Sequence, residues 1–226
     1  NYFQKLSLLL FILFTLSHLI FGSKLDTVKV VDKDYIMLHY KDGIVDYVDD
    51  GQGQYAYHGH HTEPENSFTV NYGSPLDLTI VAEVSNWIIK SNSDNNFGTS
   101  GISPTAVYRK SKVNGMNQER WGSNDWIFDY TKEHFIYLEL PYPLVQDNDY
   151  TIEIDDNLNG DRNTFTFTYD IFNCPSEAIH TNLVGYLSSS RIKAADLYHF
   201  MGDGGNRDYS SFEGNEVYIY NVDTKE

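Results

Sequence analysis

The strongest constraint on the fold is the alternation of apolar and polar residues in short runs. From Thr164 to Tyr169, threonines alternate with aromatic residues. Successive side chains of a β-strand point to opposite faces of a sheet, so this run predicts a strand whose rings face a core. No stretch has the 3.6-residue periodicity of a convincing amphipathic helix. The chain is therefore predicted to be all-β.

Other short runs rich in β-branched and aromatic residues predict further strands. They cover residues 28–31, 35–40, 44–48, 67–72, 76–84, 107–109, 125–130, 135–140 and 150–154. Lys41-Asp42-Gly43 lies between two of these runs and predicts the turn of a β-hairpin. Residues 49–65 and 91–103 are rich in polar residues and glycine, which is typical of exposed loops.

The region from Pro143 to Tyr169 resembles bacterial immunoglobulin-like domains. Pro143-Leu144 is followed by a polar loop, then by Tyr150-Thr151-Ile152, a turn containing Gly160, and the alternating Phe/Thr strand. In such folds a tyrosine at this place forms a tyrosine corner, in which the hydroxyl bonds back to the loop backbone. The resemblance implies an immunoglobulin-like β-sandwich over residues 24–173.

The most specific spacing lies in the region Ser176–Tyr220. Its pattern consists of His180-x-Asn182-x-x-Gly185-Tyr186 followed by Lys193-x-Ala195. This pattern resembles the opening of the immunoglobulin-like module at the N-terminus of family 9 glycoside hydrolases, the cellulases and their relatives. The run from Tyr198 to Gly205, with Asp208-Tyr209-Ser210 behind it, is similar to a variant of that module in bacterial polysaccharide-degrading proteins.

Together the two resemblances imply two consecutive immunoglobulin-like β-sandwich domains. The second covers residues 174–226, which is roughly half of a sandwich of about 100 residues. Glu216–Val222 predicts a strand, and turn residues follow it. We therefore expect the second sandwich to be incomplete in this chain and less stable than the first.

Charge composition limits the partners of the protein. The chain has 16 Lys and Arg against 32 Asp and Glu, a formal net charge of −16. Such a surface repels nucleic-acid phosphates and anionic membranes and is indifferent to a neutral polysaccharide. Nucleic acid is thus excluded as a partner. Cys174 is the single cysteine, so stability is expected to come from burial rather than from an internal disulfide.

The N-terminal residues 1–23 resemble a secretory signal peptide. Lys5 precedes a mainly apolar run from Leu6 to Phe21, and polar residues follow at Ser23-Lys24. The alternative is a membrane anchor, but the run is shorter than the roughly 20 residues that a membrane-spanning helix needs. The segment predicts a secreted, periplasmic or cell-surface protein that is not in the membrane after cleavage.

Two groups of residues are candidate metal ligands. Asp155, Asn157 and Asn159 match the first half of a calcium loop, but Thr166 stands where the bidentate acid is needed. The alternative is a hairpin turn that uses Asn and Gly for backbone reasons. The second group, His58-x-His60-His61-x-Glu63, lies in a flexible loop without a fourth ligand. We expect no cofactor, with calcium at Asp155–Asn159 as the remaining alternative.

No catalytic residues are predicted within the chain. A glycosidase needs two carboxylates on either side of a sugar. The paired-aspartate motif and the late glutamate of the resembled family, which lie on an α-helical barrel, do not occur in this sequence. Asp203, Asp208 and Glu213 fall in a Gly-rich loop and are interpreted as solvated turn acids. Whether the parent protein is an enzyme depends on the resemblance, which implies a glycoside hydrolase.

Aromatic residues are the remaining candidates for contact with a glycan. The rings on or near predicted loops belong to Trp87, Trp121, Trp126 and Tyr142. Aromatic residues also pack within antiparallel sheets, which is the alternative for each of them.

The resemblance implies a non-catalytic N-terminal region of a secreted polysaccharide-degrading glycoside hydrolase. Its role would be to position a catalytic (α/α) barrel absent from this chain, and polysaccharide is a second expected partner. The alternative is a free-standing extracellular module that binds glycan or protein. An enzyme complete within these residues is the least favoured hypothesis, because no acid/base constellation is found.

Overall fold

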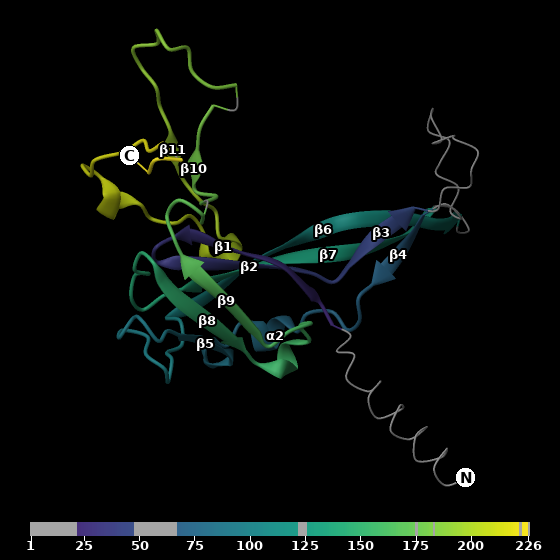
Figure 1. Ribbon diagram of the computed structural model, residues 1–226. Helices are drawn as coiled ribbons and strands as arrows, with labels where there is room; N and C mark the ends of the chain where they lie inside the picture. The colour runs from purple at the N-terminus through teal and green to yellow at the C-terminus, as the bar shows by residue number, and fades with distance from the viewer. Residues whose placement is uncertain are drawn as a thin grey trace, which may run out of the picture.

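The computed structural model describes residues 22–47, 67–121, 126–174, 176–182, 184–221 and 223–225 (Figure 1). Almost all of the predicted signal peptide and the histidine-rich loop at His58–Glu63 lie outside the described residues. Trp121 and Trp126 are described by their backbone, and their side chains lie outside the description.

No helix among the described residues is long and apolar enough to cross a membrane.

One sheet has four antiparallel strands in the order β1-β2-β7-β6. Its strands are β1 (Lys24–Asp32), β2 (Tyr35–Lys41), β7 (Trp126–Glu139) and β6 (Ala106–Trp121). The turn from β1 to β2 is closed by Asp32, whose carboxylate accepts a 2.8 Å hydrogen bond from Asp34 N. The long strands β6 and β7 continue beyond the sheet as a hairpin (Figure 1).

A second sheet of three antiparallel strands has the order β5-β8-β9. It contains β5 (Trp87–Lys90), β8 (Asn148–Ile154) and β9 (Thr164–Tyr169). If the inserted β3–β4 pair is set aside, the seven strands of both sheets follow the A-B-E-D and C-F-G orders of an immunoglobulin-like sandwich. The predicted all-β fold is confirmed.

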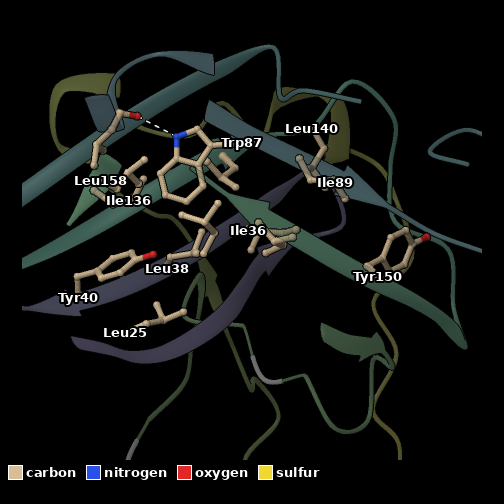
Figure 2. Packing of buried hydrophobic residues seen from close by; sticks show 14 of the residues in the cluster. Leu25, Ile36, Leu38, Tyr40, Trp87, Ile89, Ile136, Leu140, Tyr150 and Leu158 are labelled. Carbon is tan, nitrogen blue, oxygen red and sulfur yellow. Dashed lines mark hydrogen bonds between the residues drawn. The ribbon is translucent and has the colours of Figure 1, made fainter. Parts of the chain in front are cut away.

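The main core lies between these two sheets (Figure 2). Leu38 and Ile136 from the four-stranded sheet face Trp87 and Ile152 from the three-stranded sheet, and all four side chains are fully buried. Trp87 Nε1 donates a 2.9 Å hydrogen bond to Val81 O, so its polar atom is satisfied inside the core. The predicted alternation in β9 is confirmed, because its aromatic rings are half-buried against the core and its threonines are exposed.

Tyr150 forms the predicted tyrosine corner. Its ring is fully buried, and its hydroxyl accepts a 2.9 Å hydrogen bond from Val145 N in the preceding loop. The same hydroxyl donates to Asp94 Oδ2 at 2.8 Å. Burial is the main reason that the pKa of Tyr150 rises to about 12. The corner thus fastens two loops to the start of β8.

The predicted hairpin turn at Lys41-Asp42-Gly43 is wrong. β3 (Gly43–Tyr47) pairs with β4 (Ser67–Asn71) instead of folding back on β2. The chain changes sheets here because Asp42 is drawn into the protein: its backbone N donates to Lys132 O at 2.9 Å, and its side chain is buried.

A predicted strand at residues 76–84 is also wrong. The region forms the one-turn helix α2 (Leu78–Val81) and the 3₁₀ turn η2 (Val84–Asn86). The carboxylate of Asp77 accepts hydrogen bonds from Thr79 N and Ile80 N, which is the geometry of a helix N-cap. The capping interaction overrides the β-rich composition.

Residues 176–225, called here the C-terminal lobe, follow the sandwich. Their regular elements are β10 (Ile179–His180), β11 (Asp196–Leu197), and the 3₁₀ turns η4 (Gly202–Gly204) and η5 (Ser210–Phe212). The strand predicted from Glu216 is wrong, because the described residues 216–221 have no regular secondary structure. That the lobe belongs to an incomplete second sandwich stays a prediction.

The tyrosine corner can be tested with Tyr150→Phe. This change leaves Val145 N and Asp94 without the hydroxyl, and we expect the free energy of unfolding to fall by about 1–3 kcal/mol. Urea denaturation measures the loss. Tyr142→Phe is the matched control, because this ring is 44% exposed and its hydroxyl forms none of the hydrogen bonds found among the described residues. Equal stability of the two variants would contradict a role for the corner.

Candidate functional site

The C-terminal lobe packs on the outer face of the four-stranded sheet. Tyr35, Met37 and Tyr137 point away from the sandwich core and form a second, smaller core with Ala178 and Met201 of the lobe. Met201 is 3% exposed and Ala178 is fully buried. Both faces of the sheet are therefore covered at this end, and the lobe has a defined seat on the sandwich.

Arg207 holds the lobe to the turn between β1 and β2. Its Nε lies 3.0 Å from Asp32 Oδ2, and its Nη2 lies 3.0 Å from Asp34 Oδ2. The guanidinium also lies between the rings of Tyr35 and Tyr209, at 4.6 and 5.2 Å from their centroids. Burial disfavours the charge, but the two carboxylates outweigh this effect and raise the pKa of Arg207. The side chain of Arg207 is 13% exposed, so solvent screens its ion pairs poorly.

The Gly-rich turn η4 touches the free edge of β6. A Cβ atom on Gly202 would lie 2.1 Å from Arg109 O, and one on Gly204 would lie 2.5 Å from the ring of Tyr108. Asp203 Oδ1 accepts a hydrogen bond from Arg109 N. The glycines are thus required by close backbone approach. Asp203 is an exposed acid of this turn, as interpreted from the sequence, and its carboxylate also joins the lobe to the sandwich.

Away from its seat on the sandwich, the lobe exposes large aliphatic side chains in two segments. The exposed fractions are 96% for Val184, 78% for Leu187, 79% for Ile192, 88% for Val217 and 89% for Ile219. They come from the loop between β10 and β11, which projects away from the sandwich, and from the extended residues after η5 (Figure 1). Where exposed apolar side chains gather within one segment, they are typical of a protein interaction site.

The five motif residues of the predicted cellulase-type module lie within this lobe. His180 stacks on Tyr198 with 3.8 Å between ring centroids, and Asn182 Oδ1 accepts a 2.9 Å hydrogen bond from Val184 N. Gly185 has a φ of +87°. Tyr186 donates to Ala194 O, and Lys193 Nζ donates to Ser190 O at 2.9 Å. All five therefore shape the loop between β10 and β11.

The predicted glycan-contacting rings do not form one surface. The prediction for Trp87 is wrong, because the ring fills the sandwich core and is fully buried. Tyr142 is exposed and packs edge-to-face on Phe97 at 6.3 Å. Trp121 and Trp126 are paired across the β6–β7 hairpin, and their side chains lie outside the description. Of the two candidates whose rings are described, Trp87 is buried and Tyr142 lies at the surface, as predicted.

The predicted calcium ligands support the turn between β8 and β9. Asp155 Oδ1 accepts hydrogen bonds from Asn157 N at 2.8 Å and from Asn157 Nδ2 at 2.7 Å. Asn159 adopts left-handed backbone angles, and its Nδ2 donates to Pro75 O at 3.2 Å. Among the described residues, no group of three or more His, Cys, Asp or Glu side chains is arranged to hold a metal ion. The observed contacts are those of the alternative interpretation, a backbone turn.

A buried hydrogen-bond network was not predicted. His134 Nε2 lies 3.0 Å from Asp42 Oδ2, and His134 Nδ1 lies 2.8 Å from Ser111 Oγ. Asp42 Oδ1 accepts from Ser23 Oγ and from Leu76 N. Burial opposes ionisation of Asp42, but the hydrogen bonds from His134, Ser23 and Leu76 prevail and lower its pKa.

The network has the order Ser–His–Asp, but its location indicates a structural role. A hydrolase of this type presents its serine and histidine to a substrate cleft beside oxyanion-stabilising donors. Here the imidazole of His134 is 2% exposed and is enclosed by the sandwich. Ser23 belongs to this enclosure, since its N donates to Asn159 O at 2.7 Å. Gly22 also pairs with Ser74, so both residues before the predicted boundary at Lys24 belong to the sandwich.

Glu133 is a partly buried acid of β7 in the four-stranded sheet. Its Oε2 lies 2.7 Å from His39 Nε2, and its Oε1 lies 2.8 Å from Lys112 Nζ. Burial acts against the charge, yet these two partners lower the pKa of Glu133 overall. The acid is thus held ionised by basic neighbours, which suits an ion-pair network rather than proton donation to a substrate.

Comparison with known proteins identifies no relative of this chain. No protein-family model, curated protein or solved structure matches it. The functional inference therefore depends on the motif resemblance and on the contacts described above.

The turn at Asp155 can be tested with Asp155→Ala. Loss of the capping oxygen should lower the free energy of unfolding by about 1 kcal/mol, and by the same amount in EDTA and in calcium. Thermal melts in both buffers measure this. Asp156→Ala is the control, because this neighbouring side chain is exposed. A loss that appears in calcium but not in EDTA would instead support a metal site.

The network at Asp42 predicts a pH-dependent stability. Because the folded-state pKa is lowered, its contribution is complete above the unfolded pKa of about 4 and is lost as pH falls through the folded-state pKa. Asp42→Asn should lower the free energy of unfolding by about 1–3 kcal/mol at neutral pH. Urea titrations from about pH 7 to pH 3 should show the difference from wild type narrowing. A constant difference would contradict the pairing, and Asp196→Asn, at an exposed position, is the control.

Proposed function

We propose that the chain is the non-catalytic accessory region of a secreted polysaccharide-degrading glycoside hydrolase. In this proposal the C-terminal lobe docks a catalytic domain of the same polypeptide and sets its position. The observation that carries the proposal is the two-sided character of the lobe: one side is fixed to the sandwich through Arg207 and Met201, and the other exposes large aliphatic side chains.

Burial of the exposed side would be favourable. Full burial of a Val, Leu or Ile side chain stabilises by about 1.5–3 kcal/mol relative to exposure. Val217 and Ile219 are almost completely exposed, as is Val184 in the β10–β11 loop. An apolar surface on a neighbouring domain would cover them, which supports a docking role for this side of the lobe.

The anchored side supports a positioning role. A spacer orients a partner only if its own base is fixed, and the base of the lobe has several independent contacts with the sandwich. Besides the Arg207 ion pairs, Ser176 Oγ donates to Val31 O and Lys29 pairs with Glu177. The connection is short, and the turn before it is closed by hydrogen bonds from Asn173 N and Cys174 N to Asp170 O. These contacts limit rotation between the lobe and the sandwich.

The state of the carboxylates supports a non-catalytic role. A glycosidase needs one acid that keeps its proton and a second carboxylate that attacks or activates water. Three of the partly buried acids are instead matched with basic groups: Asp42 with His134, Glu133 with Lys112, and Asp32 with Arg207. Such pairing favours the ionised form and leaves the acids engaged with protein groups.

The docking role can be tested with the double substitution Val217→Ser and Ile219→Ser. Both side chains are at least 88% exposed, so the stability of this chain alone should change by less than about 0.5 kcal/mol. In the polypeptide expressed from the natural gene, the same change should lower both the melting temperature and the hydrolysis of soluble β-glucans. The matched control is Val145→Ser with Ile171→Ser, which changes exposed aliphatic residues of the sandwich and its linker.

Two results would contradict the proposed function. One is a natural polypeptide that hydrolyses no polysaccharide. The other is hydrolysis by this chain alone that disappears when one of its acidic residues is replaced. An unchanged melting temperature of the natural polypeptide after the double substitution would remove the docking role of the lobe.

A further inference from the structure

The C-terminal lobe contains an open pocket of about 800 Å³. It lies between residues 197–199 and residues 206–213, beside the seat of the lobe on the sandwich. Small-molecule sites in proteins typically have volumes of about 300–1,000 Å³ and combine aromatic walls with a few polar groups. The size of this pocket therefore suits a ligand of one or two sugar rings.

Three aromatic rings line the pocket, and their neighbours hold them in place. Tyr198 is 59% exposed, and its ring is stacked on His180 at an interplanar angle of 12°. Tyr209 and Phe212 pack edge-to-face at 5.5 Å, and the guanidinium of Arg207 lies over the Tyr209 ring. The rings thus form a preorganised apolar wall.

Polar groups stand beside these rings. Asn206, Asp208 and Glu213 line the same pocket and are exposed. Asp208 Oδ1 accepts a 2.8 Å hydrogen bond from Ser210 N, which fixes the direction of its carboxylate. The side chains of Asn206 and Glu213 form no hydrogen bond with any other described residue. Together they offer an amide and two carboxylates to a ligand hydroxyl.

We propose that this pocket binds a pyranose unit of a neutral polysaccharide. A pyranose ring has an apolar C–H face and an edge of hydroxyl groups. The rings of Tyr198 and Phe212 suit the face, and Asn206 and Glu213 suit the hydroxyls. Because the pocket is open, the glycan chain continues into solvent on either side of the bound unit.

The charges around the pocket select against anionic ligands. The positive charge of Arg207 is balanced by Asp32 and Asp34, each with an atom 3.0 Å from the guanidinium. Asp208 and Glu213 then add negative charge to the lining. Burial lowers the pKa of His199, so this lining residue contributes no compensating positive charge near neutral pH. Uronates, sulfated glycans and phosphates are repelled, whereas neutral hydroxyl groups are not.

The site goes beyond the proposed accessory role, because docking of a catalytic domain does not require it. It gives the lobe a second activity. The lobe would then both orient a neighbouring domain and hold a glycan chain near that domain.

The test is a titration of this chain with neutral tetrasaccharides, followed by amide chemical shifts. Cellotetraose, xylotetraose and mannotetraose are added up to millimolar concentration. At least one should produce saturable shifts in residues 197–213. Tyr198→Ala and Phe212→Ala should each weaken binding about tenfold, and Tyr142→Ala, at an exposed ring outside the pocket, should leave it unchanged. Thermal melts check that each variant is folded, and Glu213→Gln gives a second, less disruptive variant that should also weaken binding.

Several results would overturn the proposal. They are the absence of saturable shifts with all three sugars, shifts centred outside residues 197–213, and equal weakening by Tyr142→Ala. Tighter binding of glucosamine tetramer than of cellotetraose would replace the neutral ligand by a cationic one. Since this chain is tested without other domains, failure here leaves the docking proposal standing, and failure of docking leaves this result unchanged.

Discussion

Burial of β2 on both faces is the constraint on which the rest of the structure depends. Ile36 and Leu38 enter the sandwich core, and Tyr35 and Met37 enter the smaller core beneath the C-terminal lobe. A strand with two buried faces has no polar alternation, and the run Tyr35-Ile36-Met37-Leu38 has none. The sandwich and the lobe therefore share one strand as a common wall. Removal of the three-stranded sheet would expose Ile36 and Leu38, and removal of the lobe would expose Tyr35 and Met37.

Local patterns were sufficient to predict much of the sandwich. The aromatic alternation of β9 and the position of Tyr150 depend on neighbours within a few residues, and both were predicted correctly. The turn at Lys41-Asp42-Gly43 was not, because the turn composition was outweighed by the burial of Asp42 against His134. This pair joins residues far apart in the sequence, so no local spacing signals it. Similarly, composition could not tell that Trp87 belongs to the core, since an aromatic residue near a loop suits a surface and an interior equally well.

The residues predicted to be functional and the surfaces that support the proposals differ. The motif from His180 to Lys193 shapes a loop, and the large aliphatic side chains that this loop exposes are Val184, Leu187 and Ile192, which no motif includes. The acids of the Gly-rich segment share one interpretation in the sequence, as solvated turn acids. In the structure Asp203 contacts the sandwich and Asp208 lines a pocket. The directions of these acids depend on the close approach of Gly202 to β6. This is a tertiary contact, and the spacing of residues in the sequence does not predict it.

The contact of Ser23 with the turn after β8 has a consequence for the order of assembly. The ribosome makes Ser23 long before its partners Asn159 and Gly160, which follow most of the strands of the sandwich. The N-terminal end of β1 therefore has no complete site to occupy until Asn159 and Gly160 have been synthesised. Closing so long a loop costs conformational entropy, which the buried contacts at the junction have to offset. The N-terminal end of β1 is thus fastened only late relative to its own synthesis, at the turn that follows β8.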